Sequence, residues 1–176
     1  MEIYTLLKDD HVKVLGILDE LLSLDDNDSY RDVLIDQVRD ELIPHARAEE
    51  AVFYNSMRAV SSDNSEVMHG YKEHIEAESV LRLLQVKDAT NMDWKETATK
   101  LKESLEHHIE EEESKIFAEA KTMFSDEEVE MMGKAFLKLK EEVKGQGMLK
   151  NSFDLVANLM PPRFINQLKG ISSVDR

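Results

Sequence analysis

The chain has 176 residues and a formal net charge of -15. This length suits one well-packed domain, and the low content of Gly (6) and Pro (3) favours an all-α fold over turn-rich β folds. The acidic balance disfavours nucleic acid and anionic membranes as partners, because both need a basic surface. The sequence has no Cys, which excludes disulfides, thiolate nucleophiles, iron–sulfur clusters and thiolate zinc sites. Any metal must therefore be held by His and carboxylates.

The amino-terminal residues lack the basic start and long apolar run of a signal peptide. No uncharged segment approaches the roughly 20 apolar residues that a membrane-spanning helix needs. We therefore expect a cytoplasmic protein without a membrane span.

Four amphipathic segments with the period of an α-helix follow one another along the chain. Each places a histidine inside its apolar stripe, and three of them place a glutamate four residues later on the same face. The segments are residues 4–24, 34–60, 67–84 and 101–117, and the ionisable residues in their stripes are His11, His45, Glu49, His74, Glu78, His108 and Glu112. Burying an ionised carboxylate without a partner is costly, so this placement calls for a cation.

In an up-down-up-down four-helix bundle the four histidines fall into one layer. His11 lies 16 residues before the first turn, near Asn27, and His45 lies 18 residues after it. At a rise of about 1.5 Å per residue the two reach nearly the same height, and His74 and His108 are placed in the same way around the third turn. The sequence therefore predicts a metal site inside a four-helix bundle.

The other two histidines, His69 and His107, have polar helical neighbours, and we expect them to be exposed rather than to bind metal. His107 with Glu111 repeats the His-x-x-x-Glu spacing, but on a solvated face. Within the acidic run 110–113 only Glu112 is expected to point inward.

The number and type of ligands suggest which metal is bound. Four His and two or three Glu exceed what one tetrahedral zinc needs, whereas two ions that share bridging carboxylates can use them all. Two iron ions fit best, with manganese as a competitor. A ferritin-like site calls for Glu-x-x-His on two helices, and this spacing occurs only at Glu66 and His69, on a polar face.

Residues 124–176 follow the bundle as a C-terminal helical extension. Its first helix is expected to begin at a capping box formed by Ser125 and Glu128, and it carries no candidate ligand. Apolar residues continue on both sides of Pro161 and Pro162. The extension either packs on the bundle, residues 1–123, or docks a second copy or another protein. We expect a monomer or a homodimer.

The chain resembles the hemerythrin-like family, whose domain is also called the hemerythrin HHE cation-binding domain. The resemblance covers residues 1–123 and rests on D-D-H at 9–11, H-A-R-A-E-E-A-V-F-Y at 45–54, E-H-I-E-A-E at 73–78 and H-I-E-E-E-E-S-K-I-F at 108–117. Aligning the second of these segments with the fourth pairs His45 with His108, Glu49 with Glu112, and Phe53-Tyr54 with Ile116-Phe117.

The resemblance implies a di-iron centre that binds or reacts with O2, peroxide or nitric oxide. It implies terminal ligands at His11, His45, His74 and His108, and bridging carboxylates at Glu49 and Glu112. Oxygen carriers of the family have a second histidine four residues after the third-helix ligand, where this chain has Glu78. Glu78 is then a ligand, a nearby base or neither.

Two functions remain open at this point. The chain is a non-heme di-iron protein that binds or senses O2, nitric oxide, peroxide or iron, or it is a di-iron oxidase or peroxidase that consumes O2 or peroxide. A carboxylate at Glu78 favours the enzyme or an iron-handling role, because anionic ligands stabilise the ferric state. A third hypothesis, an interaction module without metal, predicts that Leu can replace the buried glutamates without loss of stability.

Overall fold

The computed structural model describes residues 1–86, 93–146, 156–157 and 159–164. The elements are α1 (Ile3–Ser23), α2 (Arg31–Glu49), η1 (Glu50–Tyr54), α3 (Asn55–Val60), α4 (Ser65–Gln85), α5 (Trp94–Glu111), η2 (Glu112–Ile116), α6 (Phe117–Met123), α7 (Asp126–Gln146) and η3 (Pro162–Phe164). All regular structure in these ranges is helical. The expected loop around residues 87–93 lies outside them except for Asp93, and so do the apolar tail residues Phe153, Ile165 and Leu168.

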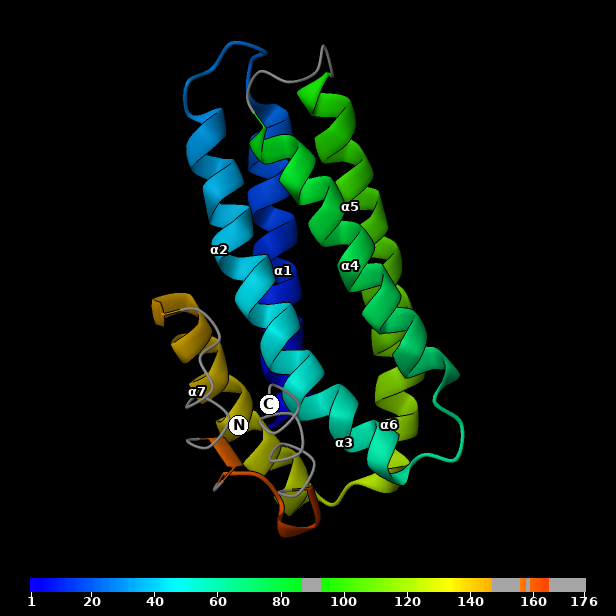
Figure 1. Ribbon diagram of the computed structural model, residues 1–176. Helices are drawn as coiled ribbons and strands as arrows, with labels where there is room; N and C mark the ends of the chain where they lie inside the picture. Colours follow the sequence, from blue (N-terminus) through cyan, green and yellow to red (C-terminus); the bar gives the residue numbers. More distant parts are fainter. Residues whose placement is uncertain (87–92, 147–155, 158, 165–176) are drawn as a thin grey trace, which may run out of the picture.

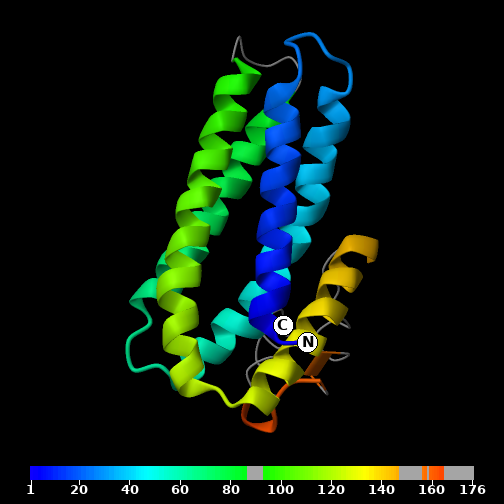
Figure 2. The same cartoon turned by 180° about the vertical axis from the view of Figure 1, so that it is seen from behind.

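The long helices α1, α2, α4 and α5 run up, down, up and down side by side (Figure 1 and Figure 2). Helix α2 continues through η1 into α3, and α5 continues through η2 into α6. The prediction of an all-α four-helix bundle with additional C-terminal helices is confirmed. Among the described residues, no helix combines the length and the apolar character required to cross a membrane.

Helix α7 lies against α2 and α1 near the amino terminus (Figure 1). Its predicted capping box is present, because Ser125 N donates to Glu128 Oε2 (2.9 Å) and Glu128 N donates to Ser125 Oγ (3.3 Å). Gly133 allows a close approach, since a Cβ atom there would collide with the backbone of residues 1–3. Docking of a partner by this extension stays a prediction.

The hydrophobic core consists of two clusters separated along the bundle. One cluster surrounds Phe53 and Phe117 and includes the buried face of α7. The other surrounds Leu18, Leu34 and Leu101 in the opposite half of the four long helices. On each of these helices the predicted histidine falls in sequence between residues of the two clusters, so a buried polar layer crosses the bundle there.

Candidate metal centre

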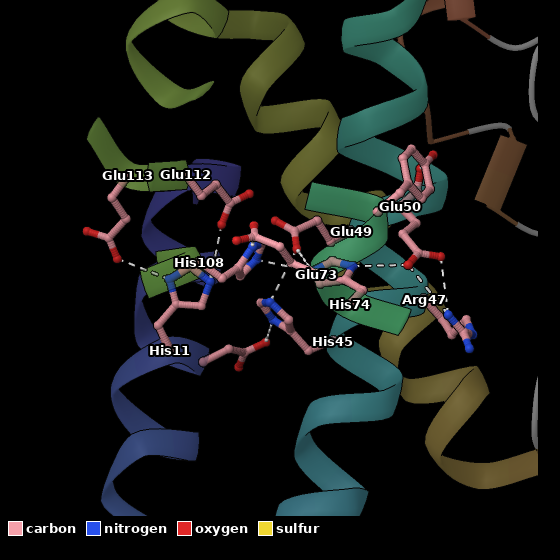
Figure 3. Close-up of polar contacts among 12 residues, drawn as sticks. His11, His45, Arg47, Glu49, Glu50, Glu73, His74, His108, Glu112 and Glu113 are labelled. Carbon is pink, nitrogen blue, oxygen red and sulfur yellow. Dashed lines mark hydrogen bonds and ion pairs between the residues drawn. The ribbon is translucent and has the colours of Figure 1, made fainter. Parts of the chain in front are cut away.

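The four predicted histidines meet in this polar layer. His11, His45, His74 and His108 come from α1, α2, α4 and α5, and all four are buried (Figure 3). The ring centroids of His11 and His45 lie 5.1 Å apart, and those of His74 and His108 lie 4.8 Å apart. The bundle therefore gathers one imidazole from each long helix into one site.

Each imidazole is oriented by a carboxylate at its Nδ1 atom. The pairs are His11 with Glu113 (3.0 Å), His45 with Asp10 (3.0 Å), His74 with Glu50 (3.0 Å) and His108 with Glu73 (2.9 Å). An imidazole that donates its Nδ1–H to a carboxylate offers the lone pair of Nε2 to a metal, and metal-binding histidines are commonly held in this way. All four histidines are thus arranged as Nε2 ligands.

Two glutamates place their carboxylates among these Nε2 atoms. Glu49 Oε2 lies 3.4 Å from His45 Nε2 and 3.3 Å from His74 Nε2. Glu112 Oε2 lies 3.3 Å from His11 Nε2. Both carboxylates are fully buried, and no described residue forms a hydrogen bond of normal geometry with them. Buried carboxylates that lack hydrogen-bond donors fit a site in which a cation balances their charge.

The carboxylate pair cannot hold two negative charges without compensation. Burial, together with the charge of Glu49, raises the pKa of Glu112 well above its usual range. Burial also opposes ionisation of Glu49, but its contacts with Glu112 and His45 outweigh this and hold the pKa of Glu49 well below its usual range. The opposite shifts show that this buried place disfavours two ionised carboxylates side by side, and a metal ion could supply the positive charge there.

The contact between His74 and His108 also calls for a positive charge between them. His74 Nε2 and His108 Nε2 lie 3.2 Å apart, and one ligand atom from each of Glu49, His74 and His108 can be chosen so that all lie within 4.8 Å of one another. Two nitrogen lone pairs at this distance repel unless a proton or a metal ion lies between them. Burial lowers the basicity of His74, but its contacts with Glu49 and Glu50 prevail and raise its pKa to about 9. The residues present fit a bound metal.

Two π-helical turns shape the carboxylate side of the site. The turn η1 begins directly after Glu49, and η2 begins at Glu112. A π turn widens the helix by one residue and is frequent at functional sites. Glu49 and Glu112 face the centre, and the next residues, Glu50 and Glu113, reach histidines on other helices. The expectation that only Glu112 of the run 110–113 points inward is therefore wrong for Glu113.

The site has an internal twofold repeat. Counterparts in the two halves of the bundle are 63 positions apart: Asp10 and Glu73, His11 and His74, His45 and His108, Glu49 and Glu112, and Glu50 and Glu113. The hydrogen bonds repeat as well, since His11 reaches Glu113 in the second half and His74 reaches Glu50 in the first. The repeat of the second and fourth segments is visible in the sequence, and the structure extends it to the first and third.

The structure does not bring Glu78 into this cluster. Its Oε1 atom forms an ion pair with Arg47 Nη2 at 2.5 Å, and its Oε2 atom lies 3.6 Å from Arg82. Its counterpart in the first half is Leu15, so the repeat also gives it no ligand role. Glu78 is a buried ion-pair partner of Arg47, and a role for its carboxylate in the chemistry stays a prediction.

Tyr54 belongs to the site, although the sequence showed it only as part of the Phe53-Tyr54 pair that aligns with Ile116-Phe117. Its ring stacks on that of His74, with centroids 5.6 Å apart and an interplanar angle of 8°. A Cβ atom on Gly70 would lie 2.6 Å from the tyrosine hydroxyl, so only glycine leaves room for it. Burial and the nearby charges of Glu112 and Glu49 raise the pKa of Tyr54 well above its usual range.

Helix α7 supports the site without supplying a ligand. Lys140 Nζ donates to Asp10 Oδ1 at 2.6 Å, and the other oxygen of Asp10 holds His45. The ring of Phe136 packs edge-on against His45 with centroids 5.8 Å apart. Helical periodicity identifies Phe136 as a core residue, but no sequence signal links Lys140 to a residue 130 positions earlier.

The fold and this cluster define a helical metal-binding protein with a His/Glu site. Residues 2–120 match the model of the hemerythrin HHE cation-binding domain, and the chain belongs to this family. This confirms the resemblance found in the sequence.

Two known proteins show how far the similarity extends. The crystal structure of a hemerythrin HHE cation-binding domain-containing protein from Mycobacterium kansasii aligns with a TM-score of 0.69 at 23% identity, over 84% of this chain and 95% of that one. This likeness shows the fold alone. A DNA nickase of Nostoc sp. is 25% identical over 144 residues, which are 82% of this chain and 40% of the nickase. The chain therefore spans well under half the length of that relative.

Proposed function

We propose that this chain is a non-heme di-iron protein that binds or senses O2, nitric oxide, peroxide or iron itself. The observation that supports this best is the convergence of four Nε2 atoms, each fixed by a carboxylate at Nδ1, on two buried carboxylates that lack donors among the described residues. Nitrogen and carboxylate ligands without thiolate suit iron, with manganese as a competitor.

The residues that would hold the metal follow the twofold repeat. His11, His45, His74 and His108 would be the nitrogen ligands, and Glu49 and Glu112 the shared carboxylates. Bound iron would supply reversible binding of a small ligand such as O2 or nitric oxide, or electron transfer to O2 or peroxide. Asp10, Glu50, Glu73 and Glu113 keep each imidazole in the tautomer that binds metal.

The space among the histidines is very small. A cavity of about 10 Å³, enough for the centre of one water-sized molecule, lies among the four histidines and the apolar side chains Val14, Leu42, Leu105 and Ile109. This space lies where the histidines converge, holds at most about one water molecule and excludes an organic substrate. The apolar side chains limit the entry of water to the ligand.

A di-iron oxidase or peroxidase is the second candidate, and Tyr54 is the observation that favours it. Its buried hydroxyl forms no hydrogen bond of normal geometry with a described residue, and its raised pKa keeps the proton on the oxygen at neutral pH. Tyr54 could therefore donate a hydrogen bond or a proton to a reduced oxygen species. This role would require the hydroxyl, whereas packing on His74 requires only the ring.

The nickase activity named for the Nostoc relative is not part of this proposal. A net charge of -15 opposes the approach of a phosphate backbone, and the similarity covers 40% of that protein.

Metal analysis and spectroscopy test the proposal. The full chain, produced with iron, should contain about two irons, as the ligand number requires. Its reduced form should change its visible spectrum on exposure to O2 or nitric oxide and recover when the gas is removed. Immediate conversion to the ferric form with turnover of peroxide would instead support the enzyme. Loss of that turnover in Tyr54→Phe would then show that the Tyr54 hydroxyl donates the proton or hydrogen bond to the oxygen species. A chain that takes up neither iron nor manganese would contradict both functions.

A further inference from the structure

A second cluster of histidine and glutamate lies on the outer face of α4 and α5. It consists of His69, Glu73, His107 and Glu111, and one ligand atom from each lies within 4.8 Å of the others. Each helix contributes a His-x-x-x-Glu pair, and residues four apart on a helix share a face. The side chains of His69 and His107 are 47% and 63% exposed, so this cluster is open to solvent, unlike the buried centre.

The distances in this cluster approach those around a four-coordinate ion. His69 Nε2 lies 3.3 Å from Glu73 Oε1 and 3.4 Å from Glu111 Oε2. His107 Nε2 lies 4.0 Å and 3.8 Å from the same two oxygens. A tetrahedral ion with bonds of about 2.0–2.2 Å keeps its ligand atoms roughly 3.3–3.6 Å apart. His69 Nε2 already has this spacing to both oxygens, and the exposed imidazole of His107 reaches it by moving a few tenths of an ångström toward them.

The twofold repeat gives an independent reason to expect a cation here. In the first half, Asp10 accepts from His45 with one oxygen and binds the Lys140 ammonium with the other. Its counterpart Glu73 accepts from His108 with Oε2, and its Oε1 faces the outer imidazoles instead of a lysine. The carboxylate in the first half thus binds a cation with the oxygen that does not hold a histidine, and the corresponding oxygen in the second half faces the outer histidines.

The outer cluster is specific to the second half of the bundle. The residues 63 positions before its two histidines and Glu111 are Leu6, Pro44 and Ala48, which are buried. Lys115 Nζ contacts Oε1 of Glu111 at 2.6 Å, which leaves Oε2 directed at the histidines. We propose that His69, Glu73, His107 and Glu111 form a second metal site, separate from the buried centre, that binds Zn²⁺ or a similar divalent first-row cation.

Zinc titration of the full chain, loaded with iron beforehand, tests this site. Calorimetry followed by metal analysis after desalting should find one equivalent of Zn²⁺ in addition to the iron. The variants His69→Ala and His107→Ala should each weaken this binding at least about ten-fold, and the double variant should lose it, because each removes an imidazole ligand. Iron content should not change. Both side chains are exposed, so their removal leaves no cavity in the core.

Glu76→Gln is the matched control. Glu76 is an exposed carboxylate on α4 that pairs with Lys72 and lies outside the cluster. Its replacement removes one negative charge from the same helix and should leave the zinc equivalent intact. Retention of the zinc equivalent in the double variant would overturn the second site. So would several weak equivalents that do not depend on His69 and His107, since an acidic surface binds cations in this way.

The outcome is independent of the proposed di-iron function. If the chain takes up no iron, the buried ligands can also bind zinc, and the total rises in the wild type and in the double variant alike. The difference of one equivalent between these two proteins still reports the outer cluster. If the outer cluster binds no zinc, the iron content and the gas-dependent spectrum are still as the di-iron function predicts.

Discussion

The two halves of the bundle, α1 with α2 and η1, and α4 with α5 and η2, carry the same inward residues in different surroundings. In the first half Asp10 is covered by α7 and binds Lys140, whereas in the second half its counterpart Glu73 faces an open surface with two histidines. The ligand layer is repeated, and the outer residues have diverged. The inner residues therefore have the same proposed role in both halves, which is to bind metal. The outer residues differ: in the first half they anchor α7, and in the second half they form the proposed second metal site.

The largest effect is expected from the inner histidines. His45→Ala and His108→Ala each remove an Nε2 ligand from one half and should reduce iron from about two per chain to one or none. His107→Ala, one residue away from His108, should leave iron content unchanged because its side chain is 63% exposed. Iron analysis of the purified proteins decides this. Loss of iron in His107→Ala but not in His108→Ala would reverse the assignment of faces on α5.

The carboxylates at Nδ1 give the next largest effect. Asp10→Asn and Glu73→Gln keep the shape of the side chain but weaken the orientation of His45 and His108. Each should lower iron affinity about 10–100-fold, the usual cost of losing a carboxylate partner of a metal-binding histidine. Competition with a chelator measures the affinity, and Glu76→Gln serves as the control. Equal affinity in wild type and both variants would show that the hydrogen bonds are incidental.

The counterpart histidines His74 and His11 should also respond differently to pH. In the metal-free chain the contacts of His74 with Glu49 and Glu50 raise its pKa to about 9. Burial and the neighbouring His45 lower the pKa of its counterpart His11 to about 4. At pH 7 a metal ion must therefore displace the proton of His74, but none from His11. Metal affinity should rise as the pH increases toward 9.

The stability of the metal-free protein should change in the opposite direction. The pKa of His74 is raised above its unfolded value of about 6.5, so its contribution is fully present below pH 6.5 and is lost as the pH rises through about 9. Urea unfolding of metal-free protein from pH 6 to 9 measures this loss, and titration with iron over the same range measures the gain in affinity. A flat metal affinity would show that His74 carries no extra proton.

Helical periodicity was sufficient to predict the bundle and the four histidines, because an apolar stripe and a residue count fix which side chains share a layer. The same reasoning placed Glu49 and Glu112 among the histidines. It could not separate Glu78 from them, since a stripe position does not show that Arg47 lies nearby and forms an ion pair with Glu78.

The remaining features depend on contacts between distant segments or on a local change of helix type. The π turn at η2 turns Glu113 toward His11, and periodicity assumes that no such turn is present. The link between Asp10 and Lys140 exists only because α7 folds back along α1 and α2. The position of Tyr54 depends on the space left by Gly70, and the sequence shows only that an aromatic residue follows Phe53.

The smallest effect is expected where α7 supports the first half. Lys140→Met keeps the apolar stem but removes the ammonium that pairs with Asp10 and, at 3.4 Å, with Glu41. The side chains of Lys140 and Asp10 are largely buried, at 14% and 17% exposure. We expect a loss of about 1 kcal/mol in the free energy of unfolding, because a partly buried carboxylate loses a charged partner. Urea unfolding measures it. Lys138→Met, which removes a more exposed lysine that pairs with Glu142, should change stability by less than about 0.5 kcal/mol. If the two variants are equally stable, the contact between α7 and Asp10 contributes nothing beyond packing, and the contrast between the covered and the open half rests on the outer histidines alone.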